Sequence, residues 1–132
     1  MKAFLKNLYS SKLFPLCWTL FTITLLCLPG SVIPGAGVFA INGLDKIVHF
    51  ILFGGIVLLW GLYVRKTYPY AVWFKKMLIA ALFSILLGVA LEYVQRYFIP
   101  GRSFDVKDIV ADAVGAVTIF LLLISTGRKK PL

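Results

Sequence analysis

The residues that could perform chemistry begin with a group near position 45. Asp45 and Lys46 lie four and three residues before His49, so a helix would place all three on one face. A histidine that a carboxylate orients can act as a general base or acid, and a lysine ammonium can bind phosphate. We therefore predict His49 and Asp45 as catalytic residues and Lys46 as a substrate-binding residue.

Later segments carry the other polar side chains of interest. Glu92 and Gln95 would share one helical face, and Arg102, Asp108 and Asp112 follow after position 100. Carboxylates serve as acids or bases, whereas guanidinium and amide groups bind phosphates and hydroxyls. The predicted catalytic set therefore gains Glu92 and Asp112, and the predicted substrate-binding set gains Gln95, Arg102 and Asp108.

Composition indicates that these groups lie in a membrane. Of the 132 residues, 61% are hydrophobic and 14% are charged, against roughly 25% charged residues in soluble domains. A small soluble domain needs many polar residues to cover its surface, and this chain does not have them. A disordered chain is excluded, a soluble one is disfavoured, and a single membrane domain over residues 1–132 is expected.

The gaps between charged residues predict an all-α bundle of four membrane helices. We expect these helices over about residues 13–29, 45–64, 76–98 and 106–126. At about 1.5 Å per residue, residues 77–91 reach only about 22 Å of a hydrocarbon core of about 30 Å. The third helix must therefore bring Glu92 and Gln95 into the membrane, and the fourth must include Asp112. Asp105 is placed to cap the start of the fourth helix.

The first predicted helix has a second interpretation as a cleaved signal peptide, with a possible cleavage site at Val38-Phe39-Ala40. We favour an uncleaved anchor because the apolar run over residues 13–28 is longer than the roughly 7 to 15 residues usual in signal peptides. Cleavage would leave three helices and the same polar groups.

The basic residues predict the orientation of the bundle. Ten of the 14 Lys and Arg residues fall on one side of it: Lys2, Lys6, Lys12, Arg65, Lys66, Lys75, Lys76, Arg128, Lys129 and Lys130. The positive-inside rule makes this side, with both termini, cytoplasmic. All five acidic residues fall on the opposite side. The net charge of +9 thus reflects orientation in a membrane, and nucleic-acid binding loses its support.

Counting residues along each helix predicts that the polar groups meet. His49, Glu92 and Asp112 each lie 16 residues from the basic residue at the cytoplasmic end of their helix, or about 24 Å. A second layer, 20 residues from the same ends, consists of Asp45, Arg96 and Asp108. These matching heights predict one polar cluster near the outer face.

Small residues predict where the helices approach one another. On the third helix, Ala80, Ser84 and Gly88 form a stripe that leads to Glu92 at a spacing of four. Gly115 lies in the fourth helix, close to its acidic residues. Small residues at such spacing let membrane helices pack closely, so Glu92 should point into the bundle.

The order of these motifs resembles that of the VanZ-like family of bacterial membrane proteins. The motifs, over roughly residues 40–120, are Asp45-Lys46-x-x-His49-Phe50, Glu92-x-x-Gln95, Pro100-x-Arg102, and Asp108 followed by Gly115. The resemblance implies a small integral membrane protein from a family whose founding member is linked to teicoplanin resistance. The family pattern usually has Asn where this chain has Asp112, so an ionisable group replaces a neutral amide.

Three functions are compatible with such a cluster. The first is an enzyme or binding protein of the bacterial cytoplasmic membrane, acting on an anionic lipid or lipid-linked cell-wall headgroup in the outer leaflet, with no cofactor predicted. The second is a non-enzymatic protein with a structural polar cluster, acting by association or by altering envelope properties. A metal site formed by His49, Glu92 and Asp112 is a third, although the spacing matches no dedicated metal motif.

Overall fold

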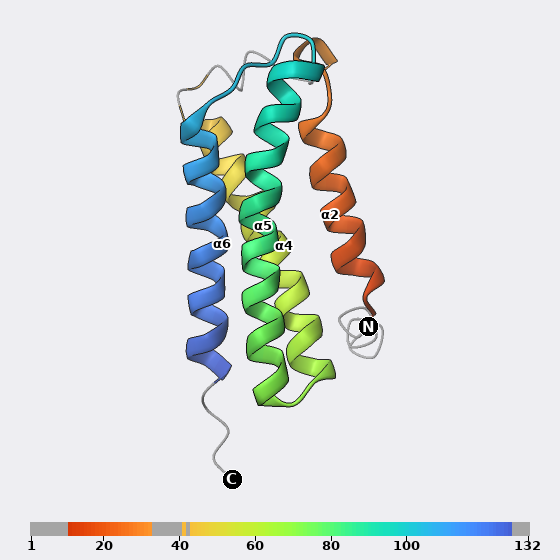
Figure 1. The fold of residues 1–132 in the computed structure, drawn as a ribbon, viewed down its shortest axis with the longest axis vertical. Coiled ribbons are helices and arrows are strands. Elements are labelled where there is room, and N and C mark those ends of the chain that lie inside the picture. Colours follow the sequence, from red (N-terminus) through yellow and green to blue (C-terminus); the bar gives the residue numbers. More distant parts are fainter. Residues whose placement is uncertain (1–10, 33–40, 42, 128–132) are drawn as a thin grey trace.

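A computed structural model of the protein describes residues 11–32, 41 and 43–127. The described chain folds into four α-helices and one short 3-10 helix (Figure 1). In chain order these elements are α2 (Leu13–Leu26), η1 (Gly30–Val32), α4 (Leu44–Thr67), α5 (Tyr70–Phe98) and α6 (Val106–Gly127). The predicted all-α class with four helices is confirmed, and no strand occurs among the described residues.

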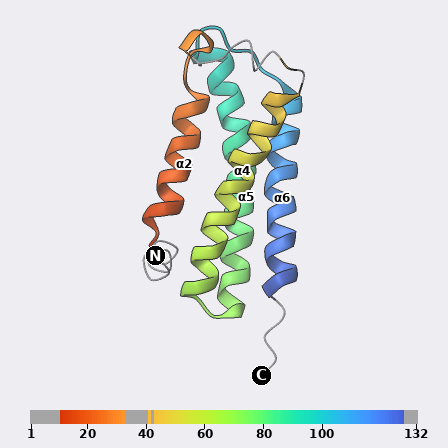
Figure 2. The ribbon, with the colours of Figure 1, turned by 180° about the vertical axis from the view of Figure 1, so that it is seen from behind.

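The helices run alternately up and down, so distant parts of the chain meet at the same end. α4 packs against both α5 and α6, whereas α2 lies at the edge and contacts mainly α4 (Figures 1 and 2). The starts of α4 and α6 and the end of α5 gather at one end of the bundle. Residues that are far apart in the sequence can therefore share one site there.

Three of the helices are long and apolar enough to cross a membrane, which identifies a membrane protein. α4, α5 and α6 contain 24, 29 and 22 residues, each with a mean hydropathy of 2.2 over its most apolar stretch. At about 1.5 Å per residue they exceed a hydrocarbon core of about 30 Å. α2 is also apolar but has only 14 residues, or about 21 Å.

Three predicted helix boundaries were wrong by three residues or more, among them the end of the second helix, which lies at Thr67 rather than at residue 64. The third helix begins at Tyr70 rather than at residue 76, directly after Pro69 in an extended conformation. Lys75 and Lys76 therefore lie inside the helix, which is possible because long basic side chains reach toward water from an apolar surface. The first helix ends at Leu26 rather than at residue 29.

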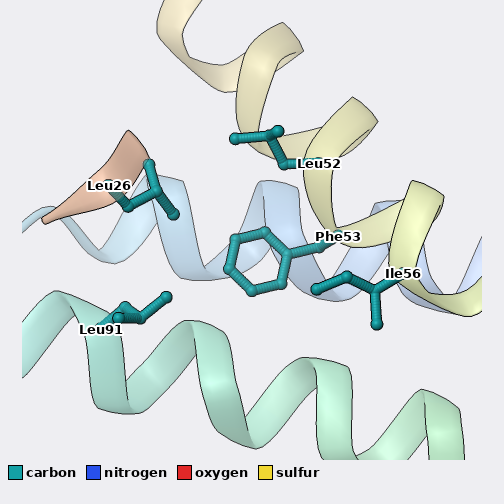
Figure 3. Close-up of a cluster of buried hydrophobic side chains, with 5 residues drawn as sticks. All are labelled: Leu26, Leu52, Phe53, Ile56 and Leu91. Carbon is teal, nitrogen blue, oxygen red and sulfur yellow. The ribbon is translucent and has the colours of Figure 1, made fainter. Parts of the chain in front are cut away.

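An apolar layer lies directly beneath the polar end of the bundle. It joins α2, α4 and α5 through five buried side chains: Leu26, Leu52, Phe53, Ile56 and Leu91 (Figure 3). The ring of Phe53 also stacks against the imidazole of His49, with 6.2 Å between the ring centroids. Phe53 thus separates the polar residues from the rest of the core.

Close helix contacts occur at two glycines that the sequence singled out. A Cβ atom on Gly115 would lie 2.4 Å from the backbone oxygen of Phe50, so α4 and α6 touch main chain to main chain there. A Cβ atom on Gly88 would lie 2.5 Å from Oδ2 of Asp112, so α5 approaches α6 through Gly88. Both contacts lie next to the polar end.

The buried stripe on α5 differs by one position from the predicted one. Ser84 and Gly88 are buried as expected, and the Ser84 hydroxyl donates to the backbone oxygen of Phe53 at 3.1 Å. Ala81 rather than Ala80 continues the stripe. The stripe still leads to Glu92, which is buried in the bundle as predicted.

Charged residues separate to the two ends of the bundle. Lys12, Arg65 and Lys66 flank the helix ends opposite the acidic residues, and Lys75 and Lys76 lie at the start of α5 at that same end. The other predicted members of this basic side lie outside the described residues: Lys2, Lys6, Arg128, Lys129 and Lys130. Residues 38–40, the alternative cleavage site, also lie outside them.

Candidate functional site

A buried polar contact joins α4 to α6 at the polar end of the bundle. His49 Nδ1 lies 2.9 Å from Asp112 Oδ1, and the two side chains are 6% and 1% exposed. When Asp112 is ionised its carboxylate can only accept, so Nδ1 then carries the hydrogen and the ring is held in one tautomer. The other nitrogen, Nε2, faces Asp108, whose Oδ2 is 3.7 Å away.

Glu92 brings a third helix to this pair. Its side chain is buried, and its Oε2 accepts a hydrogen bond of 2.9 Å from the backbone N–H of Asp105. One ligand atom each from His49, Glu92 and Asp108 lie within 4.8 Å of one another. α4, α5 and α6 therefore converge on one small volume with an imidazole and two carboxylates.

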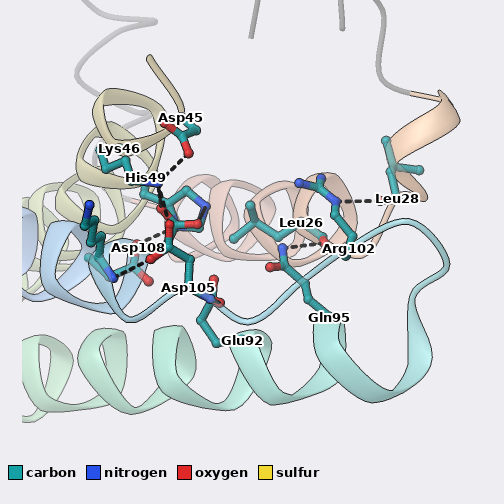
Figure 4. Close-up of polar contacts among 12 residues, drawn as sticks. Leu26, Leu28, Asp45, Lys46, His49, Glu92, Gln95, Arg102, Asp105 and Asp108 are labelled. Atoms are coloured by element: carbon teal, nitrogen blue, oxygen red, sulfur yellow. Dashed lines mark hydrogen bonds and ion pairs between the residues drawn. The ribbon is translucent and has the colours of Figure 1, made fainter. Parts of the chain in front are cut away.

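Lys46 holds the outer part of the cluster together. Its Nζ contacts the carboxylate of Asp45 and lies 2.8 Å from Asp105 Oδ2 and 2.9 Å from Asp108 Oδ1 (Figure 4). The Lys46 side chain is only 28% exposed. One ammonium thus links the start of α4 to the start of α6.

Asp105 caps α6, as predicted, and also takes part in the cluster. Its Oδ1 accepts the backbone N–H of Lys107 at 2.8 Å. The hydrogen bonds from Lys46 and from this N–H hold the pKa of Asp105 below its ordinary value of 3.8. Glu92 accepts the backbone N–H of Asp105. The side chain of Asp108 faces Lys46 and His49.

Gln95 and Arg102 lie beside the end of α2 instead. Gln95 Nε2 donates to the backbone oxygen of Leu26 at 2.9 Å, and Arg102 Nε donates to that of Leu28 at 3.3 Å (Figure 4). Carbonyl groups at a helix end lack partners in their own helix, so both bonds fasten α2 to the bundle. Within the described chain, no hydrogen bond or ion pair joins either side chain to the His49 cluster.

The structure rearranges the predicted partners of His49. Asp45 was expected to orient the imidazole, but it binds Lys46, and Asp112 from α6 takes that place. His49 on α4 and Asp112 on α6, which residue counting placed at one height, are in contact as predicted. Arg96 does not join the outer layer, because it is exposed and lies over the ring of Tyr97.

The hydrogen bond between Glu92 and the backbone of Asp105 was not predicted from the sequence. The capping pattern pointed to Asp105 only as the first residue of a helix. Its contact with α5 depends on the path of residues 99–105, which have no periodic pattern. The sequence contains one signal that this segment joins the cluster. Three of the five acidic residues of the protein lie within the eight residues 105–112.

Every acidic residue of the protein belongs to this cluster. The five are Asp45, Glu92, Asp105, Asp108 and Asp112, and they face one lysine and one histidine. Chemically, the site offers an oriented imidazole for proton transfer and several oxygen ligands.

Comparison with known proteins gives one match. A family model described as VanZ/LLP1 matches residues 4–127, which include every residue of the cluster. No curated protein and no solved structure matches the chain significantly.

Proposed function

Since the chain belongs to the VanZ/LLP1 family of membrane proteins, we propose that it acts on a lipid headgroup at the outer leaflet of the bacterial cytoplasmic membrane. The headgroup belongs to an anionic lipid or a lipid-linked cell-wall precursor. Both termini face the cytoplasm in this proposal, because five of the nine described basic residues, and none of the acidic ones, lie at the end of the bundle opposite the acidic cluster.

The observation that carries the proposal is the buried pair of His49 and Asp112 beside Glu92. Asp112 orients the imidazole, so that Nε2 can take a proton from a water or a headgroup hydroxyl and return it. Glu92, which comes from a different helix, is the second group able to exchange a proton. Asp45 contributes by holding Lys46.

In this proposal Lys46, Arg102 and Asp108 contact the headgroup, and Gln95 supports them indirectly. Lys46 reaches the phosphate by exchanging one of its carboxylate partners, and Asp108 accepts from a hydroxyl. Arg102 uses Nε for Leu28, but a guanidinium has five N–H donors in all. Gln95 acts with Arg102 by fixing the end of α2.

An apolar pocket next to the cluster is suited to the hydrocarbon chain of such a lipid. It has a volume of about 360 Å³ and lies along α4 from Phe50 to Leu59, between Trp18 of α2 and Ile119 of α6. Phe50 directly follows His49 in the sequence. A lipid could therefore keep its chain in this pocket while its headgroup contacts the polar residues.

A structural role for the cluster is the second candidate, and one observation favours it. Lys46 already has three carboxylate partners, and Gln95 and Arg102 already have backbone partners. In this alternative the cluster locks the helix ends together, and the protein acts by association or by altering the envelope.

Expression of wild-type and variant chains in a bacterium would separate the two candidates. We expect the wild-type chain to change the lipid or cell-wall precursor profile and, with it, teicoplanin susceptibility. Glu92→Gln and His49→Gln should abolish both changes at unaltered membrane levels. The matched control is Tyr93→Phe, which removes one hydroxyl from an exposed residue beside Glu92. Full activity of Glu92→Gln would favour the structural candidate.

A further inference from the structure

The inner part of the cluster contains two buried carboxyl groups, with the imidazole of His49 as the basic group beside them. Lys46 lies among Asp45, Asp105 and Asp108 at the rim of the cluster. Glu92 and Asp112, each 1% exposed, lie deeper and have no lysine or arginine partner among the described residues. Carboxylates at membrane depth normally need a positive partner, so a cation would complete this arrangement.

The positions of three side chains suit the binding of one metal ion. Ligand atoms of His49, Glu92 and Asp108 lie within 4.8 Å of one another. His49 Nε2 is 3.7 Å from Asp108 Oδ2, which is too long for a good hydrogen bond. Two ligands that each lie about 2.1 Å from the same ion are roughly 3 to 4 Å apart. A small inward movement of Glu92 would therefore complete a three-ligand set.

Asp112 supplies what a metal-binding histidine requires of its surroundings. Such a histidine donates its other ring N–H to a carboxylate or carbonyl, which fixes the ring and makes the free nitrogen a better ligand. Asp112 Oδ1 accepts from His49 Nδ1 at 2.9 Å and leaves Nε2 directed toward Asp108. The metal site considered from the sequence had Asp112 as a ligand, whereas in the structure Asp108 is the carboxylate that lies near His49 Nε2.

We infer that His49, Glu92 and Asp108 bind a divalent cation, with Asp112 as the residue that positions His49. One imidazole with two carboxylates suits Zn²⁺ or Mn²⁺ better than Mg²⁺ or Ca²⁺, which prefer oxygen ligands alone. The bound cation also gives a phosphate headgroup a positive partner among the five carboxyl groups of the cluster. This last role rests on the proposed function, whereas cation binding itself does not.

Metal binding by the purified full-length chain in detergent tests the inference. After treatment with a chelator, the protein is dialysed against Zn²⁺ or Mn²⁺, and bound metal is measured by elemental analysis and, for Mn²⁺, by electron paramagnetic resonance. We expect one ion per chain in the wild type and in Tyr93→Phe. His49→Gln, Glu92→Gln and Asp108→Asn should each bind at least 10-fold more weakly. Absence of binding by the wild type, or equal binding by all variants, would overturn the inference.

Two further measurements keep the result interpretable. Helix content by circular dichroism shows which variants fold, and Asp108→Asn serves as the mildest, because Asp108 is 13% exposed at the rim. Zn²⁺ should also raise the melting temperature of the wild type, since a ligand that binds only the folded state stabilises it.

Binding of an anionic phospholipid, added to the detergent micelles that hold the protein, separates this inference from the proposed function. The wild-type chain is compared with and without Zn²⁺. If the protein binds the ion but not the phospholipid, the metal site stands and the proposed headgroup role fails. If it binds the phospholipid equally with and without Zn²⁺, the part of the cation in headgroup binding fails, and if it binds neither, both proposals fail.

Discussion

The two oxygens of Asp112 have different surroundings, and this difference shows what the residue does. Oδ1 accepts from His49, whereas Oδ2 is buried, has no hydrogen-bond partner among residues 11–32, 41 and 43–127, and lies against Gly88. A buried polar atom without a partner is destabilising. Packing alone therefore does not explain an aspartate here, and the requirement of His49 for an acceptor does.

Two substitutions at Asp112 should differ in stability. Asp112→Asn keeps an oxygen for His49 Nδ1–H and removes a buried charge, so we expect it to unfold near the wild-type temperature. Asp112→Leu leaves the imidazole without that acceptor, and the free energy of unfolding should fall by about 1 to 3 kcal/mol. Thermal unfolding in detergent, followed by circular dichroism, measures both. An Asp112→Leu variant as stable as the wild type would show that the bond to His49 adds no stability.

Acid should loosen the start of α6 through Asp105. Its pKa is held below 3.8 in the folded state by Lys46 and by the Lys107 N–H. The stability that it contributes is therefore complete above the unfolded pKa of about 3.9 and is lost as the pH falls through the folded pKa. We expect the unfolding free energy of Asp105→Asn to depend less steeply on pH than that of the wild type below about pH 4.

Denaturation at a series of pH values in a non-ionic detergent would measure this difference. Ser103→Ala is the matched control, because it changes an exposed side chain in the same connection and should follow the wild-type curve. Parallel curves for Asp105→Asn and the wild type would mean that the contacts of Asp105 do not stabilise the fold.

The existence and order of the four helices were predicted from the sequence more accurately than the residues at which they begin and end. Stretches without charge located all four, because apolar length is what a membrane requires. Taking charges as helix ends failed at α5, which begins at Tyr70 and contains Lys75 and Lys76 in its first two turns. Pro69 is the true signal, since it favours an extended conformation before the helix.

Site contacts between two helices could be predicted from the sequence, whereas contacts that depend on the connections between helices could not. Counting residues along α4 and α6 placed His49 and Asp112 at one height, and they form a hydrogen bond. The predicted place of Arg102 in the cluster depended on the path of residues 99–105, which no periodicity describes. Arg102 contacts Leu28 instead.

The contact of α4 with α6 should depend on Gly115. A Cβ atom there would meet the backbone oxygen of Phe50 at 2.4 Å, so Gly115→Ala must push the two helices apart. We expect a loss of about 1 to 3 kcal/mol in unfolding free energy, the usual effect of overpacking. The shift should also weaken the bond between His49 and Asp112.

Gly61→Ala is the control for the same pair of helices. Its Cβ atom would meet Cδ1 of Leu123 at 2.5 Å, and that atom ends a flexible side chain that can move aside. Alanine also favours the helix by up to about 1 kcal/mol over glycine. The control should therefore keep wild-type stability, and equal losses in both variants would contradict a special role for the backbone contact at Gly115.

For the molecule as a whole, the separation of charge predicts one orientation in the membrane. The acidic cluster lies at one end, and Arg65, Lys66, Lys75 and Lys76, around the turn from α4 to α5, lie at the other. The positive-inside rule places the basic end in the cytoplasm. Ser103, in the connection between α5 and α6, should then face outward, and Lys75 should face the cytoplasm.

Cysteine labelling in intact cells tests this orientation. Cys17 and Cys27 are unpaired, so both are first replaced by serine. Ser103→Cys should react with a membrane-impermeant maleimide in intact cells, whereas Lys75→Cys should react only after the membrane is opened. Both positions are exposed in the structure, so a difference in labelling reports the side of the membrane rather than burial. The opposite pattern would place the acidic cluster at the cytoplasmic face. That result would overturn an outer-leaflet substrate and leave cation binding by His49, Glu92 and Asp108 untouched, because those ligands converge whichever way the bundle is inserted.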